Sequence, residues 1–346
     1  MPGHVYQCGL GELARSFVMP RFNGPRRKTF LITGCNGFVG QHMARTLIVA
    51  GHNVVALTYG DNSELRSISK RIKIIEVNLL HPKRTYEALK GMDSDFIVHL
   101  AGQSSIPLSW KKPEYTLRVN ILGTLNLLEI ARRTDFRGQI LIVGAGAEYG
   151  GSGGDSEMIR ENHSFTPKSV YAVSKIGEDL LGLIYAEAYG LAVLRVRPFN
   201  LIGPGRLGGV CSDFARGVVE IEQRRAVVLN VGNLNVVRDF LDVRDFVSGL
   251  LTVLHAGEVR ECYNICAGKG HRVGEILEIL NGLSRVDFSV NVDKTILRKA
   301  EDKTEIGDNS KLLRLGWRPL VPFEQSIRDV LEWWRSQPPS AQRGRR

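Results

Sequence analysis

The stretch Thr29-Phe30-Leu31-Ile32-Thr33 and the residues after it, Gly34-Cys35-Asn36-Gly37-Phe38-Val39-Gly40, decide the fold of this chain. A short apolar run with the length of a buried strand leads directly into a glycine-rich turn, and a helical stretch follows. Glycines permit the tight turn and let backbone amides approach a pyrophosphate, an anion that the N-terminus of a helix also favours. The order of strand, turn and helix therefore predicts a dinucleotide-binding loop. Its expected contact residues are Gly34, Asn36, Gly37, Phe38 and Gly40.

Short apolar runs alternate with longer amphipathic stretches from residue 29 to about residue 197. This alternation is typical of βαβ units, and strands that are apolar along their length suit a parallel sheet covered by helices on both faces. We therefore predict a doubly wound α/β fold of the Rossmann type. The predicted strands are Thr29–Thr33, Asn53–Leu57, Lys73–Val77, Phe96–Leu100, Gln139–Val143 and Ala192–Val196.

The regular alternation ends after Pro198, where Ile202-Gly203-Pro204-Gly205 is rich in turn-forming residues. We predict that a second, smaller C-terminal α/β domain begins here, and that Phe240–Leu254 returns to the first domain. Val273–Leu280 and Phe323–Trp334 have the apolar stripes of surface helices. The predicted division is residues 29–200 with 237–262 for the dinucleotide-binding domain and residues 201–236 with 263–335 for the second domain, flanked by basic segments at 1–28 and 336–346.

The positive charge of the chain is concentrated at its ends. The chain holds 46 Lys and Arg against 36 Asp and Glu, a formal net charge of +10. Residues 1–28 carry a net +4 and residues 335–346 another +4, which leaves about +2 for the body. Such charge is typical of solvated tails, and the body has no basic stripe interleaved with aromatic residues, so we expect no nucleic-acid binding. No apolar run approaches the roughly 20 residues of a membrane-spanning helix, so we expect no membrane span.

The first 28 residues are basic, nearly free of acids and without the continuous apolar core of a signal peptide. A transit peptide, a flexible arm and an extension upstream of a start at Met19 are the alternatives, and the last two are favoured. We therefore leave this segment out of the fold prediction.

The cysteines are scattered and odd in number: Cys8, Cys35, Cys211, Cys262 and Cys266. This pattern favours free thiols in the reducing cytoplasm over a disulfide framework. Cys262 and Cys266 lie four residues apart, but no further His or Cys pair stands near them at metal-site spacing. We therefore expect no metal.

The end of the second predicted strand indicates which dinucleotide binds. A carboxylate there would accept a bond from the ribose 2′-hydroxyl and repel a 2′-phosphate. Thr58 and Tyr59 stand at this place, and Asp61 follows only further on. The sequence therefore favours NADP(H) over NAD(H). Arg66 is either a partner for the 2′-phosphate or an exposed loop arginine.

Tyr171 and Lys175 are four residues apart at the start of a helical stretch that runs to about Tyr189. Residues at this spacing share one face of a helix, so a phenol and an ammonium can reach the same ligand. A nearby cation lowers the pKa of a phenol and prepares it to exchange a proton while a hydride moves. We therefore predict that Tyr171 and Lys175 are catalytic, with Lys175 also holding the nicotinamide ribose.

With these motifs, the chain resembles the extended short-chain dehydrogenase/reductase family over nearly all of residues 29–335. Further motifs carry the likeness: His99-Leu-Ala-Gly-Gln-Ser104, Asn120-Ile-Leu-Gly-Thr124, Arg197-Pro-Phe-Asn200 and Arg238-Asp-Phe-Leu-Asp-Val243. The resemblance implies a homodimer built through helices that begin near Asn120 and Tyr171. It also implies further cofactor contacts at Thr58, Asn78, Leu79, Leu100, Ala101, Gln103, Pro198 and Asn200, beside Tyr171 and Lys175.

Within that family, the segments 212–216, 231–234, 238–240 and 307–311 are most similar to the GDP-mannose branch of 4,6-dehydratases and 4-keto-6-deoxy-mannose reductases. The resemblance implies a nucleoside-diphosphate sugar as substrate, linked to GDP, and a role in polysaccharide synthesis. Asn200, Arg238 and Arg298 would hold the nucleoside diphosphate, and Ser104 and Ala145 would lie at the sugar. A guanidinium such as that of Arg238 suits two phosphate oxygens, although a structural network between Arg238 and Asp239 is the alternative.

One departure from the family bears on the reaction. Relative to Tyr149-Gly150, Ala145 stands where the family places a Ser or Thr that bonds the reacting sugar oxygen, and Ala147 where dehydratases place a Glu. A methyl group cannot remove the C5 proton that dehydration requires, and Glu148 would substitute only in a bulged turn. Ser104, Ser105 and Ser152 are candidate replacement hydroxyls or ordinary loop serines.

Three functions follow from this pattern. The leading hypothesis is reduction of a GDP-linked 4-keto-6-deoxy sugar, with Tyr171 as proton donor. The second is a nucleotide-sugar epimerase that retains NAD. The third is a protein like GDP-mannose 4,6-dehydratase with impaired activity, or a non-catalytic binder of nucleotide sugars, because Ala145 and Ala147 lack the usual functional groups.

Overall fold

The main sheet has seven parallel strands, and it contains all six predicted strands with ends that agree to within two residues. The computed structural model describes residues 22, 27–151, 157–293 and 303–338. In their order across the sheet the strands are β10 Cys262–Ile265, β6 Ala192–Pro198, β5 Gln139–Val143, β4 Phe96–His99, β1 Thr29–Thr33, β2 Asn53–Thr58 and β3 Lys73–Glu76. The predicted doubly wound α/β fold is confirmed.

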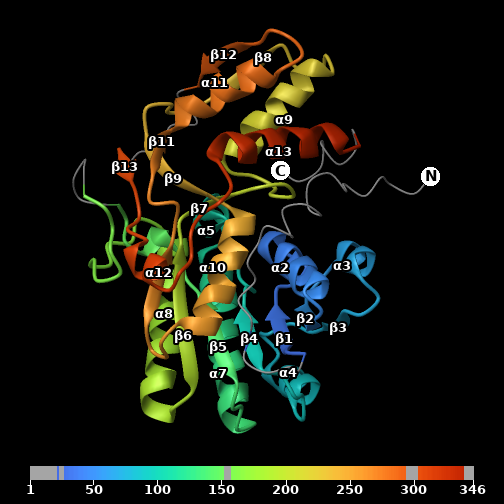
Figure 1. Cartoon of the computed structure of the whole chain (residues 1–346), viewed down its shortest axis with the longest axis vertical. Helices are drawn as coiled ribbons and strands as arrows, with labels where there is room; N and C mark the ends of the chain where they lie inside the picture. The colour runs from blue at the N-terminus through green and yellow to red at the C-terminus, as the bar shows by residue number, and fades with distance from the viewer. Residues whose placement is uncertain (1–21, 23–26, 152–156, 294–302, 339–346) are drawn as a thin grey trace.

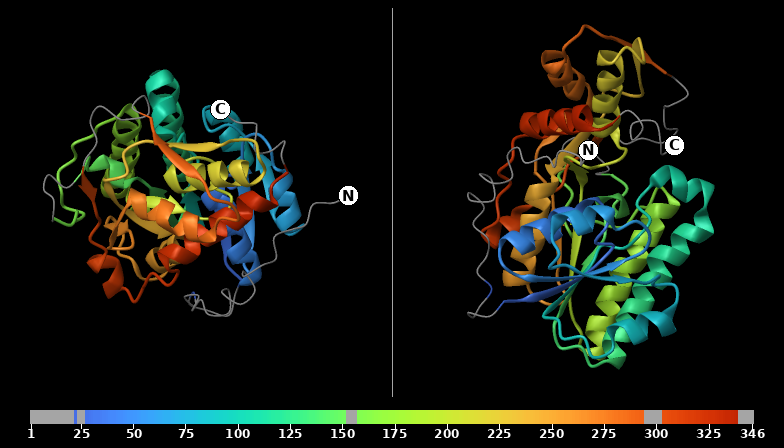
Figure 2. Two further views of the ribbon diagram at one scale, coloured as in Figure 1. Left: turned by 90° about the horizontal axis from the view of Figure 1, so that it is seen from above. Right: turned by 90° about the vertical axis from the view of Figure 1, so that its right-hand side faces the viewer.

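Both faces of the sheet are buried, as the continuously apolar strands predict. Successive side chains of β1 point to opposite faces, so Phe30 and Ile32 join one hydrophobic core and Leu31 joins another. One layer of helices covers the first face and a second layer covers the other (Figure 2). The first layer is α2 Phe38–Val49, α3 Ser63–Ile68, α10 Val243–Ala256 and α12 Ser310–Arg314; the second is α4 Pro82–Leu89, α7 Gly123–Arg133 and α8 Val170–Tyr189.

The strand order reverses between β1 and β4. The chain runs outward from β1 to β2 and β3, then crosses back to β4 and continues outward to β5 and β6. Loops that leave the carboxyl ends of β1 and β4 therefore diverge, and in open α/β sheets ligands bind in the crevice formed at such a point. The glycine-rich turn at Gly34–Gly40 and the loop after His99 leave the sheet at this point.

A second hydrophobic core lies beyond the carboxyl edge of the main sheet, in the upper part of Figure 1. Its helices are α9 Val210–Glu222, α11 Val273–Leu283 and α13 Phe323–Ser336. The short strands here are β7 Asn200–Ile202, β8 Val228–Val231, β9 Val237–Asp242, β11 Gly270–Arg272, β12 Ser289–Val292 and β13 Thr304–Glu305. The two helices that the apolar stripes predicted are thus α11 and α13.

Two segments after Pro198 pack against the main sheet. Phe246 and Leu250 of α10 share a core with Phe30 of β1, as do Leu312 and Trp317 around α12. β10 pairs with β6 in the main sheet, and the domain boundary predicted at residue 262 falls on its first residue. The division of the chain into two domains stays a prediction.

Most of the basic N-terminal segment lies outside the described residues, but Phe22 is placed. Its ring packs against the stacked rings of Phe30 and Phe96 at centroid distances of 5.6 and 5.1 Å, and His52 and His255 complete the cluster. Phe22 is 9% exposed. Phe22 therefore adds its ring to the first hydrophobic core.

No helix within the described ranges is long and apolar enough to cross a membrane.

Candidate active site

The glycine-rich turn leaves no room for side chains on its inner surface. Gly34 has a φ of +64°, and a Cβ there would lie 2.7 Å from the Cα of Ala101. A Cβ on Gly40 would lie 2.6 Å from the Cα of Cys35, so the start of α2 packs directly on the turn. The turn and the loop after β4 are therefore in backbone contact. This arrangement lets an extended anion approach the backbone.

The N-terminus of α2 offers free backbone donors. Its first residue is preceded by Gly37, and within the described chain no side chain caps this end. The amide of Asn36 donates to the carbonyl oxygens of Tyr59 and Asp61 at 3.1 and 3.0 Å, which fixes the turn against the loop after β2. An uncapped helix N-terminus on a fixed turn is suited to a pyrophosphate.

Two buried oxygen atoms at the end of β2 have no hydrogen-bond partner among the described residues. They are Oγ1 of Thr58, which is 2% exposed, and Oδ1 of Asn62. Buried polar groups are normally paired, so unpaired ones indicate a place for a missing ligand. The carboxylate of Asp61 accepts hydrogen bonds from the backbone N–H and the hydroxyl of Ser63, so it stabilises the loop between β2 and α3. Arg66 is exposed on α3.

A chain of hydrogen bonds joins β1, β4 and α7 behind the turn. The Oγ1 of Thr33 accepts from the backbone N–H of Ala101 and lies 2.7 Å from Nδ1 of His99, while Nε2 of His99 lies 2.9 Å from Oγ1 of Thr124. The Thr124 hydroxyl donates to the carbonyl of Asn120 at 2.7 Å, so His99 must donate from Nε2 and accept at Nδ1. Burial, with Lys175 nearby, lowers the pKa of His99 to about 3. His99 is a neutral structural residue.

Asn120 connects the loop after β4 to α8. Its Oδ1 accepts from the backbone N–H of Gln103 at 2.7 Å, and its Nδ2 donates to the carbonyl of Gln103 and to Oγ of Ser174. Ser174 in turn donates to the carbonyl of Tyr171. The helix predicted to begin near Asn120 begins earlier, with α6 Pro113–Leu117, and passes through a π-helical turn, Arg118–Leu122, into α7. Such turns are frequent at functional sites because they redirect a side chain.

Tyr171 and Lys175 lie in the first two turns of α8, which Ser169 caps by accepting from the backbone N–H of Ala172. The Lys175 ammonium donates to Oε2 of Glu178 at 2.9 Å, and both side chains are buried. Burial raises the pKa of Tyr171; Lys175 opposes this change, and Glu178 and Glu148 add to it. Burial alone would lower the pKa of Lys175, but Glu178 outweighs it and the pKa is raised. The lysine is therefore charged.

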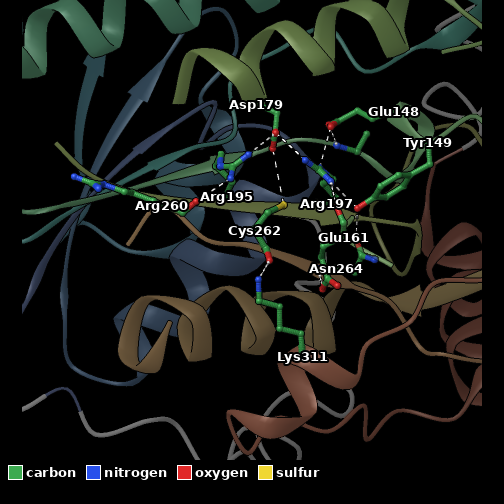
Figure 3. A network of polar contacts seen from close by, with 11 residues as sticks. Glu148, Tyr149, Glu161, Asp179, Arg195, Arg197, Arg260, Cys262, Asn264 and Lys311 are labelled. Carbon is green, nitrogen blue, oxygen red and sulfur yellow. Dashed lines mark hydrogen bonds and ion pairs between the residues drawn. The ribbon is translucent and has the colours of Figure 1, made fainter. Parts of the chain in front are cut away.

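The end of β5 carries no base that can reach a ligand. Ala145 and Ala147 are methyl side chains, and Glu148 follows in a short 3-10 turn, Gly146–Glu148. The Glu148 carboxylate is fully buried, accepts from the backbone N–H of Ala145 at 2.6 Å and pairs with Nε of Arg197 at 3.1 Å (Figure 3). A Cβ on Gly144 would lie 2.3 Å from its Oε1, so glycine is needed to admit the carboxylate. The bulged turn that would free Glu148 as a base is absent from this described segment.

Glu148 belongs to a buried polar network centred on Arg197 of β6 (Figure 3). The guanidinium donates to Asp179 of α8 at 2.8 Å and to the phenol oxygen of Tyr149 at 2.8 Å. Asp179 also accepts from Arg195 at 2.7 Å, and Tyr149 donates to Asn264 of β10. This network joins the 3-10 turn after β5 to β6, β10 and the middle of α8, where Asp179 lies.

The predicted diphosphate-binding residues are only partly brought together. Asn200 of β7 donates to the carbonyl of Asp239 at 3.3 Å, and Arg238 of β9 has its Nε 3.6 Å from a Glu305 oxygen. Asp239 is buried and accepts from the backbone N–H groups of Ala267, Gly268 and Gly307. The alternative of an Arg238–Asp239 surface network is therefore wrong, because Asp239 holds loops together from the interior. Arg298 lies outside the described residues.

A pocket with about 270 Å³ of free space, partly open to solvent, lies beside the start of α9. Asn200, Arg206 and Ser212 are among its lining residues. The Arg206 guanidinium donates to the carbonyls of Leu201 and Gly208 and lies 5.8 Å from the ring of Phe38. The Arg206 side chain is half-buried, and its hydrogen bonds to backbone carbonyls hold it at the pocket.

Sequence reasoning did not single out Asn120, Glu178 or Arg206. Asn120 was visible only as part of a family motif. Glu178 carries a signal of its own, because it lies three residues after Lys175 and seven after Tyr171 and so shares their helix face. Arg206 follows a glycine-rich loop and had no signal at all. Of the candidate hydroxyls, Ser105 caps the helix α5 Ile106–Lys111, Ser104 is exposed, and Ser152 lies outside the described residues.

The remaining predicted cofactor residues lie at or just after the carboxyl ends of β3, β4 and β6. Leu100 donates its backbone N–H to the Thr33 carbonyl, and Pro198 ends β6. Asn78 caps the turn before α4 by accepting from the backbone N–H of Leu80, and the carbonyl of Leu79 accepts from Asn126. Across the described ranges, no three His, Cys, Asp or Glu side chains group as metal ligands would.

Comparison with known proteins places these features in a family. A family model described as GDP-mannose 4,6 dehydratase matches residues 31–330. The GDP-6-deoxy-D-mannose reductase of Pseudomonas aeruginosa is 34% identical over 308 residues, which cover 88% of this chain and 96% of that protein.

Two solved structures show the same fold. RMD from Pseudomonas aeruginosa complexed with NADPH superposes with a TM-score of 0.78 at 33% identity, over 89% of this chain and 99% of that one. The UDP-glucose 4-epimerase of Thermus thermophilus complexed with NAD superposes with a TM-score of 0.80 at 25% identity, again over 89% and 99%. The chain belongs to the GDP-mannose 4,6-dehydratase family of extended short-chain dehydrogenases/reductases and is an NAD(P)-dependent enzyme of that class.

Proposed function

We propose that this protein reduces a 4-keto-6-deoxy sugar linked to GDP, with Tyr171 as the proton donor. One observation carries the proposal: the half-buried Tyr171 and the buried Lys175 share one helix face as a proton-transfer pair, whereas the end of β5 offers no base. A ketone reduction needs the first feature and does not need the second. The likeness to the GDP-6-deoxy-D-mannose reductase of Pseudomonas aeruginosa supports the same choice.

The residues of the crevice fit a dinucleotide. The surface at Gly34, which a Cβ would fill, and the uncapped N-terminus of α2 would hold the pyrophosphate. The unpartnered oxygens of Thr58 and Asn62 would bond the adenosine ribose. Because no carboxylate follows β2 directly, we propose NADP(H) as the preferred form, with the exposed Arg66 near its 2′-phosphate. NAD(P)H, when bound, supplies the hydride.

The chain's own residues supply and control the proton. As the carbonyl carbon becomes tetrahedral, its oxygen takes the proton of the Tyr171 phenol, and the phenolate regains a proton from water. The Lys175 ammonium stabilises that phenolate while it exists. Ser174, held by Asn120, fixes the first turn of α8 relative to the loop at Gln103. The donor thus has a fixed position before the substrate arrives.

The same geometry argues against dehydration. Removal of a C5 proton requires a base on the sugar, and at the end of β5 the only carboxylate in the described chain, that of Glu148, is bound to Ala145 and Arg197. We therefore propose that this member of the family has lost or never had dehydratase activity.

The nucleoside diphosphate would lie toward the second core. Asn200 and Arg206 line one pocket, and Arg238 lies on β9, which pairs directly with β7. Two guanidinium groups near a pyrophosphate would neutralise most of its charge. Arg298, a predicted partner, belongs to the same proposal on the basis of the family resemblance alone.

A homodimer is part of the proposal. Apolar side chains are exposed along α8 and along the helix that runs from α6 through the π-helical turn, a surface that a second copy would cover. These residues are Tyr115, Leu122, Val173, Leu180, Ile184 and Tyr189. Cys35, Cys211, Cys262 and Cys266 are buried free thiols, which fits the proposed cytoplasmic location.

An epimerase that retains NAD is the second candidate, because the epimerase of Thermus thermophilus has the same fold and epimerisation also needs no C5 base. A binder without activity is the third, motivated by the missing hydroxyl at Ala145.

The test is incubation of the purified protein with GDP-4-keto-6-deoxy-mannose and either NADPH or NADH. We expect loss of the nicotinamide absorbance and formation of a GDP-6-deoxy sugar. Isomer formation without net cofactor consumption would favour the epimerase instead. Binding of nucleotide sugar by calorimetry without any turnover would leave only the binder.

A further inference from the structure

Glu178 is a buried carboxylate that the proposed reaction does not use. It lies on α8 with no exposed surface, its Oε2 accepts from the Lys175 ammonium at 2.9 Å, and its Oε1 has no hydrogen-bond partner in the described part of the chain. A Cβ on Gly102, in the loop after β4, would lie 3.9 Å from Oε1. The carboxylate therefore lies between the catalytic lysine and the loop predicted to contact the cofactor.

Tyr171, Lys175 and Glu178 form one row on α8. Residues four and seven positions apart are stacked on successive turns of the same helix face, so the ammonium lies between the phenol and the carboxylate along the row. An isolated ammonium would stabilise a phenolate, and a carboxylate paired with that ammonium cancels part of this effect. The charge seen by the phenol is therefore that of an ion pair and not that of a free cation.

We propose that Glu178 is a positioning residue whose carboxylate holds and partly neutralises the Lys175 ammonium, and so keeps Tyr171 in the phenol form that donates a proton. Reduction of a ketone begins from the phenol, whereas oxidation of an alcohol begins from the phenolate. The site is thus prepared for reduction before any ligand binds. The direction of catalysis in this statement rests on the proposed reductase, but the effect of Glu178 on Tyr171 does not.

The other charged groups near the row do not provide this balance. Glu148 of the 3-10 turn also disfavours ionisation of Tyr171, but it is bound to Arg197 of β6. Asp179 of α8 is bound to Arg195 and Arg197. His99 of β4 is neutral, and Arg206, after β7, favours the phenolate. Burial raises the pKa of Glu178 to about 7, with Lys175 opposing, so the carboxylate is partly charged at neutral pH and fully charged above it.

The experiment measures the ionisation of Tyr171 without substrate. Phenolate absorbance is titrated in the wild-type protein and in Glu178→Gln, each against the same protein carrying Tyr171→Phe, so that the difference reports Tyr171 alone. We expect the Gln variant to ionise Tyr171 about one pH unit lower than the wild type, because an opposing charge has been removed. Glu178→Asp, which retains the charge, should lie between the two. Glu187→Gln, on the exposed end of α8, is the matched control and should titrate like the wild type.

A second readout is the pH profile of kcat/KM for keto-sugar reduction. The alkaline limb should move to lower pH in Glu178→Gln by the same amount as the phenolate titration, while KM changes little. A merely structural role for Glu178 would lower activity at every pH and leave the limb in place.

Identical titrations of Tyr171 in wild type and Glu178→Gln would overturn the proposal, as would identical titrations of the Asp and Gln variants. If the Gln variant does not fold, the wild type alone still decides, because a Tyr171 phenolate present at neutral pH contradicts the proposal. Absence of turnover with every keto sugar, together with the expected titration shift, would reject the proposed reductase and leave the role of Glu178 standing.

Discussion

Two buried glutamates lie close to the reacting groups, and their surroundings differ. Glu148, at the end of β5, accepts from a backbone N–H and pairs with an arginine that is itself bound to Asp179. Glu178, on α8, pairs with Lys175 alone, and its Oε1 has neither a hydrogen bond nor an ion pair among the described residues, whereas Oε2 of Glu148 lacks a hydrogen bond but lies 3.1 Å from the Arg197 guanidinium. We conclude that a buried carboxylate has a structural role when its partners are structural groups, as for Glu148. It can affect catalysis when its partner is a proposed catalytic residue, as for Glu178 and Lys175.

The most direct test of this comparison is a substitution of Tyr171, the proposed proton donor. Tyr171→Phe should reduce kcat by about 10³-fold, because it removes the proton donor without changing the shape of the helix. Cofactor binding, measured by the fluorescence of bound NAD(P)H, should persist. Activity close to that of the wild type would show that the reaction is controlled elsewhere.

The structural side of the comparison predicts an effect on folding. Arg197→Met should lower the free energy of unfolding by about 3–5 kcal/mol, because the buried Asp179 keeps only Arg195 and the Tyr149 phenol loses the guanidinium that donates to it. Urea unfolding followed by circular dichroism measures this change. The exposed Arg137, which pairs only with Asp135, gives the control Arg137→Met, which should change stability by less than about 0.5 kcal/mol. A small effect of Arg197→Met would contradict the assignment of Glu148 to the scaffold.

Ala145→Ser adds a hydrogen-bond donor at the end of β5, the region of Glu148, and so tests whether this region can contribute to catalysis. Ala145 is in extended conformation and buried after β5, at the position where the family resemblance implies a hydroxyl that bonds the sugar oxygen. We expect kcat to rise by about tenfold, since a donor to a developing oxyanion lowers the barrier. Steady-state rates with a saturating keto sugar check this, and Ala147→Ser serves as a neighbouring control. An unchanged rate would mean that another group already supplies the bond.

The smallest expected effect is a dependence of stability on pH. Burial and the charge of Asp179 raise the pKa of Glu148, although Arg197 opposes them. A carboxyl whose pKa is raised in the folded state stabilises fully below its unfolded pKa of about 4.5, and this contribution is lost as the pH rises through the folded value. Glu148→Gln removes the titration, so its stability relative to the wild type should increase by about 1 kcal/mol between pH 5.5 and 6.5. Parallel stability curves across this range would contradict a raised pKa.

Much of the fold could be predicted from the sequence because the strands have clear local sequence patterns. Apolar runs such as Gln139–Val143 and the glycines after Thr33 reflect local requirements of a buried parallel sheet and a tight turn. The seventh strand, β10, was not among the predicted strands. Its Asn264 interrupts the apolar pattern, and only the folded protein shows that Tyr149 and the Ile159 carbonyl satisfy that amide.

Candidate site residues could be predicted where a short sequence spacing indicates a shared role. They could not be predicted where a role depends on contacts between residues far apart in the sequence. Tyr171 and Lys175 could be identified from a four-residue separation. The engagement of Glu148 could not, because it depends on Arg197, which lies 49 residues later and on another strand. Asn120 likewise acquires its role from Gln103 and Ser174, and no local pattern encodes such a junction.

The hydrogen-bond chain from Thr33 through His99 to Thr124 has a consequence for how the enzyme responds to acid. The lowered pKa of His99 means that folding loses stability as the pH falls below the ordinary histidine value, while the imidazole inside the folded molecule stays uncharged. The hydrogen-bond chain that links β1, β4 and α7 therefore stays intact in the folded protein at moderately acidic pH. We expect it to be lost only when the whole protein unfolds. A change in activity between pH 5 and pH 9 therefore does not come from protonation of His99, whereas Glu178, with a pKa of about 7, titrates within this range.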